Sequence, residues 1–308
     1  MRQKTILVRV AAIFVTLGLA SQAPYFRTSA QSAHTAGTVD VAVGPQYDTT
    51  HVYVAPQDFD RFVASVIATF GGTLAQAGVA TVTPTPSSTR MQLVLTPVGS
   101  LSVFGFTTPI PYPFGLERTG YLVTDLDEAV RAAKTTGADV LVAPFPDPIG
   151  RDVVIQWPGG VNTQLYWHTT PPSYPTLQTV PENRVYVSSD RVGAFVRSFL
   201  DFSRGQVISD EARAPGIEIG RPGDTYRRIR IESKFGKLSA LATDGHLPYP
   251  YGREIMGYEV TNLVDTLTKA KPAGVDVLVP PYKTDEREAV VVQFPGGYIA
   301  EVHATAQR

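Results

Sequence analysis

Hydrophobic and polar positions after residue 45 alternate in the short runs that strands and amphipathic helices require. Val52–Val54 is a short β-rich run, and a helical stretch led by an aspartate follows it and ends at Gly71. Two further strands are predicted over Met91–Leu95 and Leu101–Phe106, on either side of a Gly-Ser pair. We interpret this segment, in which the pattern identifies three strands, as a first module of the β-α-β-β-β kind.

A second module of the same kind follows. Tyr121–Val123 predicts a strand, and Asp125 or Asp127 can cap a helix that ends at Gly137, because glycine tolerates the left-handed turn. Three more strands are predicted over Val140–Val142, Val153–Trp157 and Thr163–Trp167. The order β-α-β-β-β therefore occurs twice before residue 170.

The chain contains a long internal repeat. Gly120–Gly160 and Gly257–Gly297 align without a gap at an offset of 137, and 19 of 41 positions are identical. Such a period is too long for a solenoid repeat and indicates domain duplication. We expect one unit over residues 46–170 and a second over 182–305, joined by a Pro-rich linker over 171–181.

The N-terminal residues resemble a secretory signal peptide. Basic residues precede an apolar run over Val10–Ala20, and small residues surround a potential cleavage site after Ala23. The apolar run is shorter than the ~20 residues that span a bilayer. We therefore predict a signal peptide over 1–23, a flexible lead-in over 24–45, and a periplasmic or secreted protein without stable membrane insertion. An uncleaved anchor would also place the domains outside the cytoplasm.

Composition excludes several classes of function. The net charge is −1 and no basic cluster stands out, which argues against nucleic acid as a partner. The chain has no cysteine, so thiolate ligands, cysteine nucleophiles and disulfides are excluded. The sequence also lacks the HExxH, GxSxG, GxGxxG and P-loop patterns.

Several strings resemble the vicinal oxygen chelate superfamily, which includes glyoxalase I, bleomycin-resistance proteins and extradiol dioxygenases. They are HVYVAPQDFDRF, GYLVTDLDEAVRAAKTTGADVLVAPF, GRDVVIQWPGG with NTQLYW, and FPGGYIAEVH. The resemblance covers nearly all of the chain after the predicted signal peptide. It implies an α+β fold of tandem βαβββ modules, four in all, which form two cup-shaped mixed sheets with helices outside. In active members a divalent metal lies at the base of the cup, held by His, Glu or Gln of the first and last strands.

Strand alternation predicts which side chains of the first unit face its cup. Val52 and Val54 should face the helix. The expected cup-facing residues are His51, Tyr53, Arg118, Gln164, Tyr166 and His168. By the resemblance, His51 and Gln164 match metal-ligand positions of the family, and His168 is a further candidate ligand on the last strand. Arg118 stands at the second-module position where the family often has a histidine. An arginine there favours an anionic ligand over a dication.

The same parity in the second unit turns Arg184, Tyr186, Glu259, Glu301 and His303 toward a cup. By the resemblance, Glu301 matches the last-strand ligand, with His303 beside it, and Arg184 replaces the first-strand histidine. Glu259 needs a partner if it is buried. Arg184 could form an ion pair with it; alternatively, Glu259 and Glu301 could form a carboxylate pair for acid–base catalysis.

Three hypotheses for function follow. In the first, the protein binds a small organic molecule and acts as a lyase, isomerase or dioxygenase with one divalent metal (Fe, Mn, Ni, Co or Zn). In the second, it is a metal-free binding or sequestering module of the bleomycin-resistance type, in which tyrosines and Arg118 or Arg184 contact the ligand. In the third, side chains fill both cups. An oligomer is compatible with each hypothesis but is not required.

Overall fold

The computed structural model describes residues 40–284 and 286–305. The predicted signal peptide (1–23) and most of the predicted lead-in (24–45) lie outside the described residues. Among the described residues, no helix combines the length and the apolar character needed to cross a membrane.

The first half of the chain forms a nine-stranded sheet in the order β2-β4-β5-β1-β6-β9-β8-β7, with β3 paired to β4. Its strands are β1 (Asp48–Tyr53), β2 (Thr73–Leu74), β3 (Gly78–Ala80), β4 (Thr89–Thr96), β5 (Gly99–Phe106), β6 (Thr119–Leu122), β7 (Asp139–Pro146), β8 (Gly150–Gln156) and β9 (Asn162–His168). Its helices are α1 (Phe59–Phe70) and α2 (Leu126–Thr135), with short 3-10 helices over Pro45–Tyr47 and Pro56–Asp58. The first strand of each module runs parallel to its last, and β1 and β6 join the two modules in antiparallel fashion.

The second half forms an eight-stranded sheet in the order β11-β12-β13-β10-β14-β17-β16-β15, which repeats the first. Its strands are β10 (Glu182–Ser188), β11 (Gln206–Pro215), β12 (Thr225–Ser233), β13 (Gly236–Thr243), β14 (Ile255–Glu259), β15 (Asp276–Lys283), β16 (Arg287–Gln293) and β17 (Ile299–Thr305). Its helices are α3 (Val192–Ser203) and α4 (Leu263–Ala270), with 3-10 helices over Gly216–Ile219 and Lys271–Ala273. The structure thus confirms the predicted α+β fold of βαβββ modules and two curled mixed sheets.

Local sequence explains how α2 and α4 begin and how α2 ends. The Asp125 side chain accepts a hydrogen bond of 2.9 Å from the backbone N–H of Glu128 and so caps α2. Asn262 accepts the equivalent bond of 3.0 Å from the N–H of Asp265 at the start of α4. Gly137, with φ 99°, follows α2 in the left-handed region where glycine is favoured.

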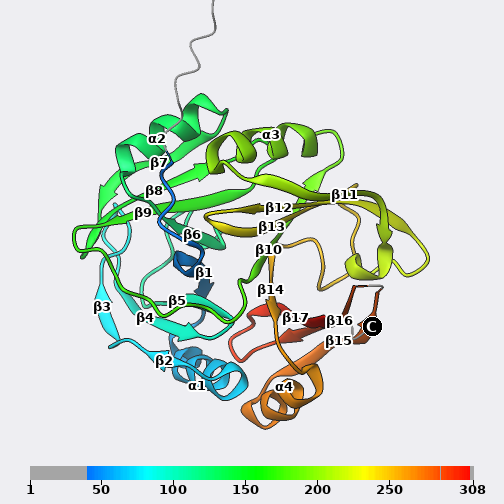
Figure 1. Cartoon of the computed structure of the whole chain (residues 1–308). Coiled ribbons are helices and arrows are strands. Elements are labelled where there is room, and N and C mark those ends of the chain that lie inside the picture. Colours follow the sequence, from blue (N-terminus) through cyan, green and yellow to red (C-terminus); the bar gives the residue numbers. More distant parts are fainter. Residues whose placement is uncertain (1–39, 285, 306–308) are drawn as a thin grey trace, which may run out of the picture. The chain divides into compact units, whose positions relative to one another are not determined.

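The two halves share their hydrophobic cores. One core joins α1 to α4, and the other joins α2 to α3, so helices of different halves lie side by side (Figure 1). Val52 and Val54 face the first of these cores, as alternation predicted. In the second core, Trp157 packs edge-to-face on Phe199 of α3 with ring centroids 5.6 Å apart. Because the helices cover one face of each sheet, the opposite, concave face is left for the cups.

Candidate functional site

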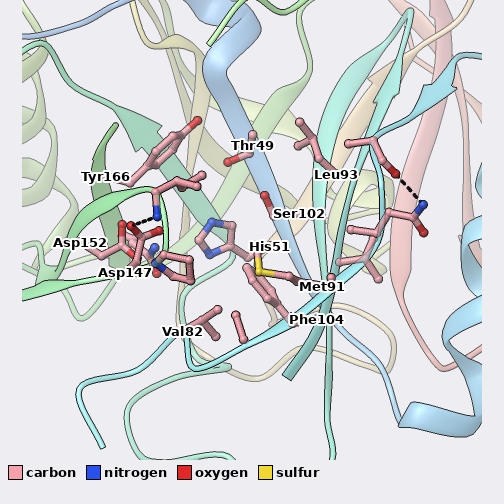
Figure 2. Close-up of a pocket in the computed structure, with 18 of the residues that line it drawn as sticks. Thr49, His51, Val82, Met91, Leu93, Ser102, Phe104, Asp147, Asp152 and Tyr166 are labelled. Atoms are coloured by element: carbon pink, nitrogen blue, oxygen red, sulfur yellow. Dashed lines mark hydrogen bonds between the residues drawn. The ribbon is translucent and has the colours of Figure 1, made fainter. Parts of the chain in front are cut away.

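The concave face of the first sheet, here called the first cup, contains a cavity of about 460 Å³. This volume lies within the range of known sites for small organic ligands. His51 lies beside the cavity, with Met91 and Phe104 on one side of it and Asp147 and Asp152 on the other (Figure 2). The short strand β3, which the sequence did not predict, supplies part of the wall through Val79 and Ala80.

Aromatic rings form much of the apolar lining. The rings of Phe104 and His51 meet edge-to-face at a centroid distance of 5.4 Å, and Tyr53 stacks on Phe104 at 5.2 Å. Tyr166 lines the cavity from β9, and its hydroxyl donates a 2.7 Å hydrogen bond to the backbone oxygen of Tyr47. These contacts hold the rings in place, so the apolar surface exists before any ligand binds.

A buried acid lies behind the His51 side of the cup. Glu117 accepts a hydrogen bond from the Tyr53 hydroxyl, and its Oε1 lies 3.7 Å from Nδ1 of His51. Burial and the negative charge of Glu117 raise the pKa of Tyr53 well above its usual value. Nε2 of His51 lies over Gly120, where an added Cβ would come within 2.4 Å of it. Gly120 therefore makes room for the imidazole, and Glu117 is a site residue that the sequence analysis missed.

Asp152 on β8 is a second residue that the sequence analysis missed. Its side chain lines the cavity, the residue is only 3% exposed, and Oδ1 has no hydrogen-bond partner. Burial raises its pKa well above the usual range, and the negative charges of Asp147 and Glu117 add to this effect. The available sequence signal was the alternation of side chains along its strand. Asp152 pairs with Tyr166 and so faces the cup as Tyr166 does.

The structure brings most of the predicted cup residues of the first unit together. His51, Tyr53, Gln164, Tyr166 and His168 all line the cavity.

Arg118, which was predicted to face the first cup, does not line that cavity. It lies in a separate pocket of about 260 Å³ with Glu254 and Tyr298 of the second half. Strand β6 begins only at Thr119, so the alternation does not extend to Arg118, and Glu117 lies near His51 instead.

The predicted metal ligands of the first cup do not form a compact set. Gln164 and His168 lie four residues apart on β9, which at ~3.3 Å per residue separates their Cα atoms by ~13 Å. Within the part of the chain that the structure describes, the one group of three His, Cys or acidic ligands that come close enough to share an ion lies elsewhere. The histidines and acids of the first cup therefore do not form a compact three-ligand set for a metal ion among the described residues.

Charged side chains crowd the equivalent region of the second sheet, here called the second cup, and leave a smaller pocket of about 280 Å³ beside them. Arg184 is only 2% exposed, and its Nη1 lies 2.5 Å from Oε2 of Glu301. Nη1 of Arg287 lies 2.6 Å from Oε2 of Glu182 and 3.1 Å from Oε1 of Glu301. Nδ1 of His303 lies 3.1 Å from the same Oε1. We call these five residues the charged network.

The charged network corrects the predicted pairing of the second unit. Arg184 pairs with Glu301 rather than with Glu259. Glu259 lies toward the strand end, where it accepts a 2.9 Å hydrogen bond from the Thr305 hydroxyl and lies 3.5 Å from Nζ of Lys237. The two carboxylates thus have different partners and do not form the proposed acid–base pair.

The pKa directions agree with this arrangement. Burial would raise the pKa of Glu301, but the charges of Arg184 and Arg287 and the hydrogen bond with His303 lower it to about 2. Burial would also raise the pKa of Glu259, but the hydrogen bond with Thr305 and the charge of Lys237 outweigh this effect. The pKa of Glu259 is therefore lowered as well. Tyr186, the remaining predicted ligand contact, packs against a cluster that contains Tyr226 and Leu241.

Three side chains of the second cup lie close enough together to bind a metal ion, but neighbouring arginines oppose the charge of one. Ligand atoms of Glu182, Glu301 and His303 all lie within 4.8 Å of one another, so the three groups could bind one ion. Both carboxylates, however, already bind arginines, and a dication would have to enter beside the buried guanidinium group of Arg184 and the partly buried one of Arg287. Like charges at such distances in a buried site repel strongly. The donor set as it stands therefore does not fit a divalent metal.

The strand pairing shows which residues of the two cups occupy equivalent positions. Thr49 pairs with Gly120 and Gly120 with Gln164, whereas Glu182 pairs with Gly257 and Gly257 with Glu301. His51 and Arg184 are equivalent by the same criterion, since each lies opposite a serine of the neighbouring parallel strand. Small or neutral residues of the first cup are therefore replaced by long charged ones in the second.

Comparisons with known proteins bear on the fold. No protein-family model matches the sequence, and no curated protein matches it. Among solved structures, the chain is similar to a variant of 4-hydroxymandelate synthase from Streptomyces coelicolor, with TM-score 0.58, 13% identity and coverage of 86% of this chain and 94% of that one. It is also similar to the 2,3-dioxygenase LapB from Pseudomonas sp. KL28, with TM-score 0.50, 10% identity and coverage of 88% and 94%. At these identities the similarity establishes the fold alone.

Proposed function

Because the chain has the tandem vicinal oxygen chelate fold, we propose that it is a metal-free binding protein for a small organic molecule, held in the first cup. One observation carries this proposal: the first cup contains a hollow of about 460 Å³, whereas ion pairs cross the second cup. Concave, mostly apolar sites with a few polar groups are typical of small-molecule binding.

The polar groups of the first cup suit recognition of a ligand. Nδ1 of His51 and Oδ1 of Asp152 are buried without a hydrogen-bond partner. A buried polar atom without a partner costs about 1–3 kcal/mol, and a ligand that supplies the missing bond recovers this free energy. Oδ1 of Asp152 would fix the orientation of a ligand, while the aromatic rings supply contact area.

A metal-dependent lyase, isomerase or dioxygenase is less well supported. The predicted ligands of the first cup are spread along β9, and the carboxylates of the second cup already bind arginines. Binding in the first cup requires neither set. The proposal therefore keeps the small organic ligand and omits the metal.

We extend the proposal to export, on the support of the basic and apolar pattern of residues 1–23. The mature protein would then work in the periplasm or outside the cell. Intact-mass measurement of the protein from the exported fraction tests this point, and the full-length mass in that fraction would contradict cleavage.

Elemental analysis and fragment binding together test the proposed function. We expect the purified protein to carry no stoichiometric Fe, Mn, Ni, Co or Zn, and EDTA to leave its melting temperature unchanged. We also expect ligand-observed NMR with a library of small aromatic fragments to detect binders that EDTA does not displace. Binding that requires a stoichiometric metal, or a library without a single binder, would overturn the proposal.

A further inference from the structure

The ionisable groups that line the first cup include acids but no arginine or lysine. Asp147 and Asp152 line the cavity, Glu117 lies just behind it, and no lysine or arginine is among the described residues of the lining. The two arginines that the sequence analysis assigned to an anionic ligand lie elsewhere. Arg118 occupies the separate pocket with Glu254, and Arg184 pairs with Glu301.

Asp152 is the acid best placed to contact a ligand. It lies on β8 between Phe145 of β7 and Tyr166 of β9, and it faces the cavity on the same wall as Asp147 (Figure 2). Asp147 caps its own turn by accepting a 3.0 Å hydrogen bond from the backbone N–H of Ile149. Asp152 has no comparable partner for Oδ1. A buried acid that is unpartnered and open to a cavity is a binding position for a donor that the protein itself does not provide.

We propose that the first cup binds an organic amine whose protonated nitrogen lies between Asp152 and Asp147. This inference rests on the proposed function and specifies the chemical class of its ligand. The hydrocarbon or aromatic part of the ligand lies against Met91 and Phe104 on the opposite wall. Charge-assisted hydrogen bonds from an ammonium group to carboxylates are short and strong.

Aromatic rings add to the attraction for a cation. The rings that line the cavity belong to Tyr53, Phe104, Phe114, Tyr166 and Tyr174. A cation over such a ring gains about 0.5–2 kcal/mol, and more when water is excluded. A carboxylate ligand would instead meet acids of like charge in a site without any arginine or lysine to offset them. The cup therefore selects against anions as well as for cations.

Proton release should accompany amine binding. In the free protein, burial and the charges of Asp147 and Glu117 raise the pKa of Asp152 well above its usual range, which favours its protonated form. The other titratable groups that face it are Tyr166 and His168 of β9 and His51 of β1. An ammonium ion beside Asp152 favours the charged carboxylate, and the displaced proton leaves to solvent.

A matched set of three ligands tests the inference. The probes are 4-phenylbutylamine, 4-phenylbutanol and 4-phenylbutyrate, which share one skeleton and carry positive, zero and negative charge. Isothermal titration calorimetry at pH 7 should give an affinity for the amine at least tenfold higher than for the alcohol, with the carboxylate weakest. Titration in two buffers of different ionisation enthalpy should reveal net proton release with the amine and none with the alcohol.

Asp152→Asn is the informative variant, because it keeps the side-chain volume and removes the charge. It should reduce amine affinity to that of the alcohol, abolish proton release and leave alcohol binding within twofold of wild type. Asp139→Asn removes an exposed charge from the neighbouring strand β7 and should change nothing. Equal binding of the three probes, or preference for the carboxylate, would overturn amine recognition alone. Failure of all three to bind would count against the cup as a ligand site, and so against the proposed function.

Discussion

Replacing Glu301 by glutamine is expected to lower the free energy of unfolding by about 3–5 kcal/mol, the range for breaking a buried ion pair. The change leaves Arg184 buried without its partner at 2.5 Å and removes one of the two carboxylates that contact Arg287. Urea unfolding followed by circular dichroism measures the loss. Glu259→Gln is the matched control, since Glu259 lies at the strand end near Lys237 and should cost less than about 1 kcal/mol.

Removing the charges of both Arg184 and Glu301 distinguishes the effect of their ion pair from an effect on packing. The double variant Arg184→Met with Glu301→Met leaves neither of the two charges unpaired, so it should recover much of the stability lost in Glu301→Gln. A Glu301→Gln protein as stable as wild type would show that the Arg184–Glu301 pair is not formed.

The same pair should respond to acid in a defined direction. The pKa of Glu301 falls from 4.5 to about 2 in the folded protein. Because this folded-state pKa is depressed, its contribution to stability is present above about pH 4.5 and is lost as the pH falls toward 2. The stability difference between wild type and Glu301→Gln should therefore shrink over that range. A difference that stays constant would contradict the assignment.

Filling the first cup with Ser102→Trp is expected to weaken binding of any cup ligand by at least about a hundredfold. Ser102 lies opposite His51 in the sheet and borders the cavity (Figure 2). The indole can occupy space that is empty in the free protein, so the melting temperature should change little. Calorimetry with 4-phenylbutanol measures the loss without involving Asp152.

Ser188→Trp provides the matched control. It introduces the same side chain at the exposed end of β10, away from the first cup, and should leave affinity unchanged. If Ser102→Trp folds and still binds with wild-type affinity, the ligand lies somewhere other than the first cup.

The fold could be predicted because it depends on signals that are local and repeated. The duplicated segments, the aspartate before α2 and the alternation of valines with polar residues each specify an element without reference to the rest of the chain. The same alternation placed His51, Tyr53 and Gln164 correctly, because each lies inside a regular strand.

The errors arise where local rules stop applying. Arg118 precedes the first residue of β6, so strand parity could not orient it. The partner of Arg184 depends on distances across three strands, and its long side chain reaches Glu301 of β17 rather than Glu259 at the far end of β14. Asp152 became recognisable as a site residue only when the fold showed that it faces a cavity without a partner.

Anomalous scattering from a crystal soaked with 4-(4-bromophenyl)butylamine would locate both a ligand and any bound metal in one experiment. We expect the bromine peak inside the first cup, with the amine beside Asp152, and no metal peak among Glu182, Glu301 and His303. A bromine peak in the second cup, or a metal ion bound there in place of the Arg184–Glu301 pair, would contradict the assignment of the ligand to the first cup and of ion pairs to the second.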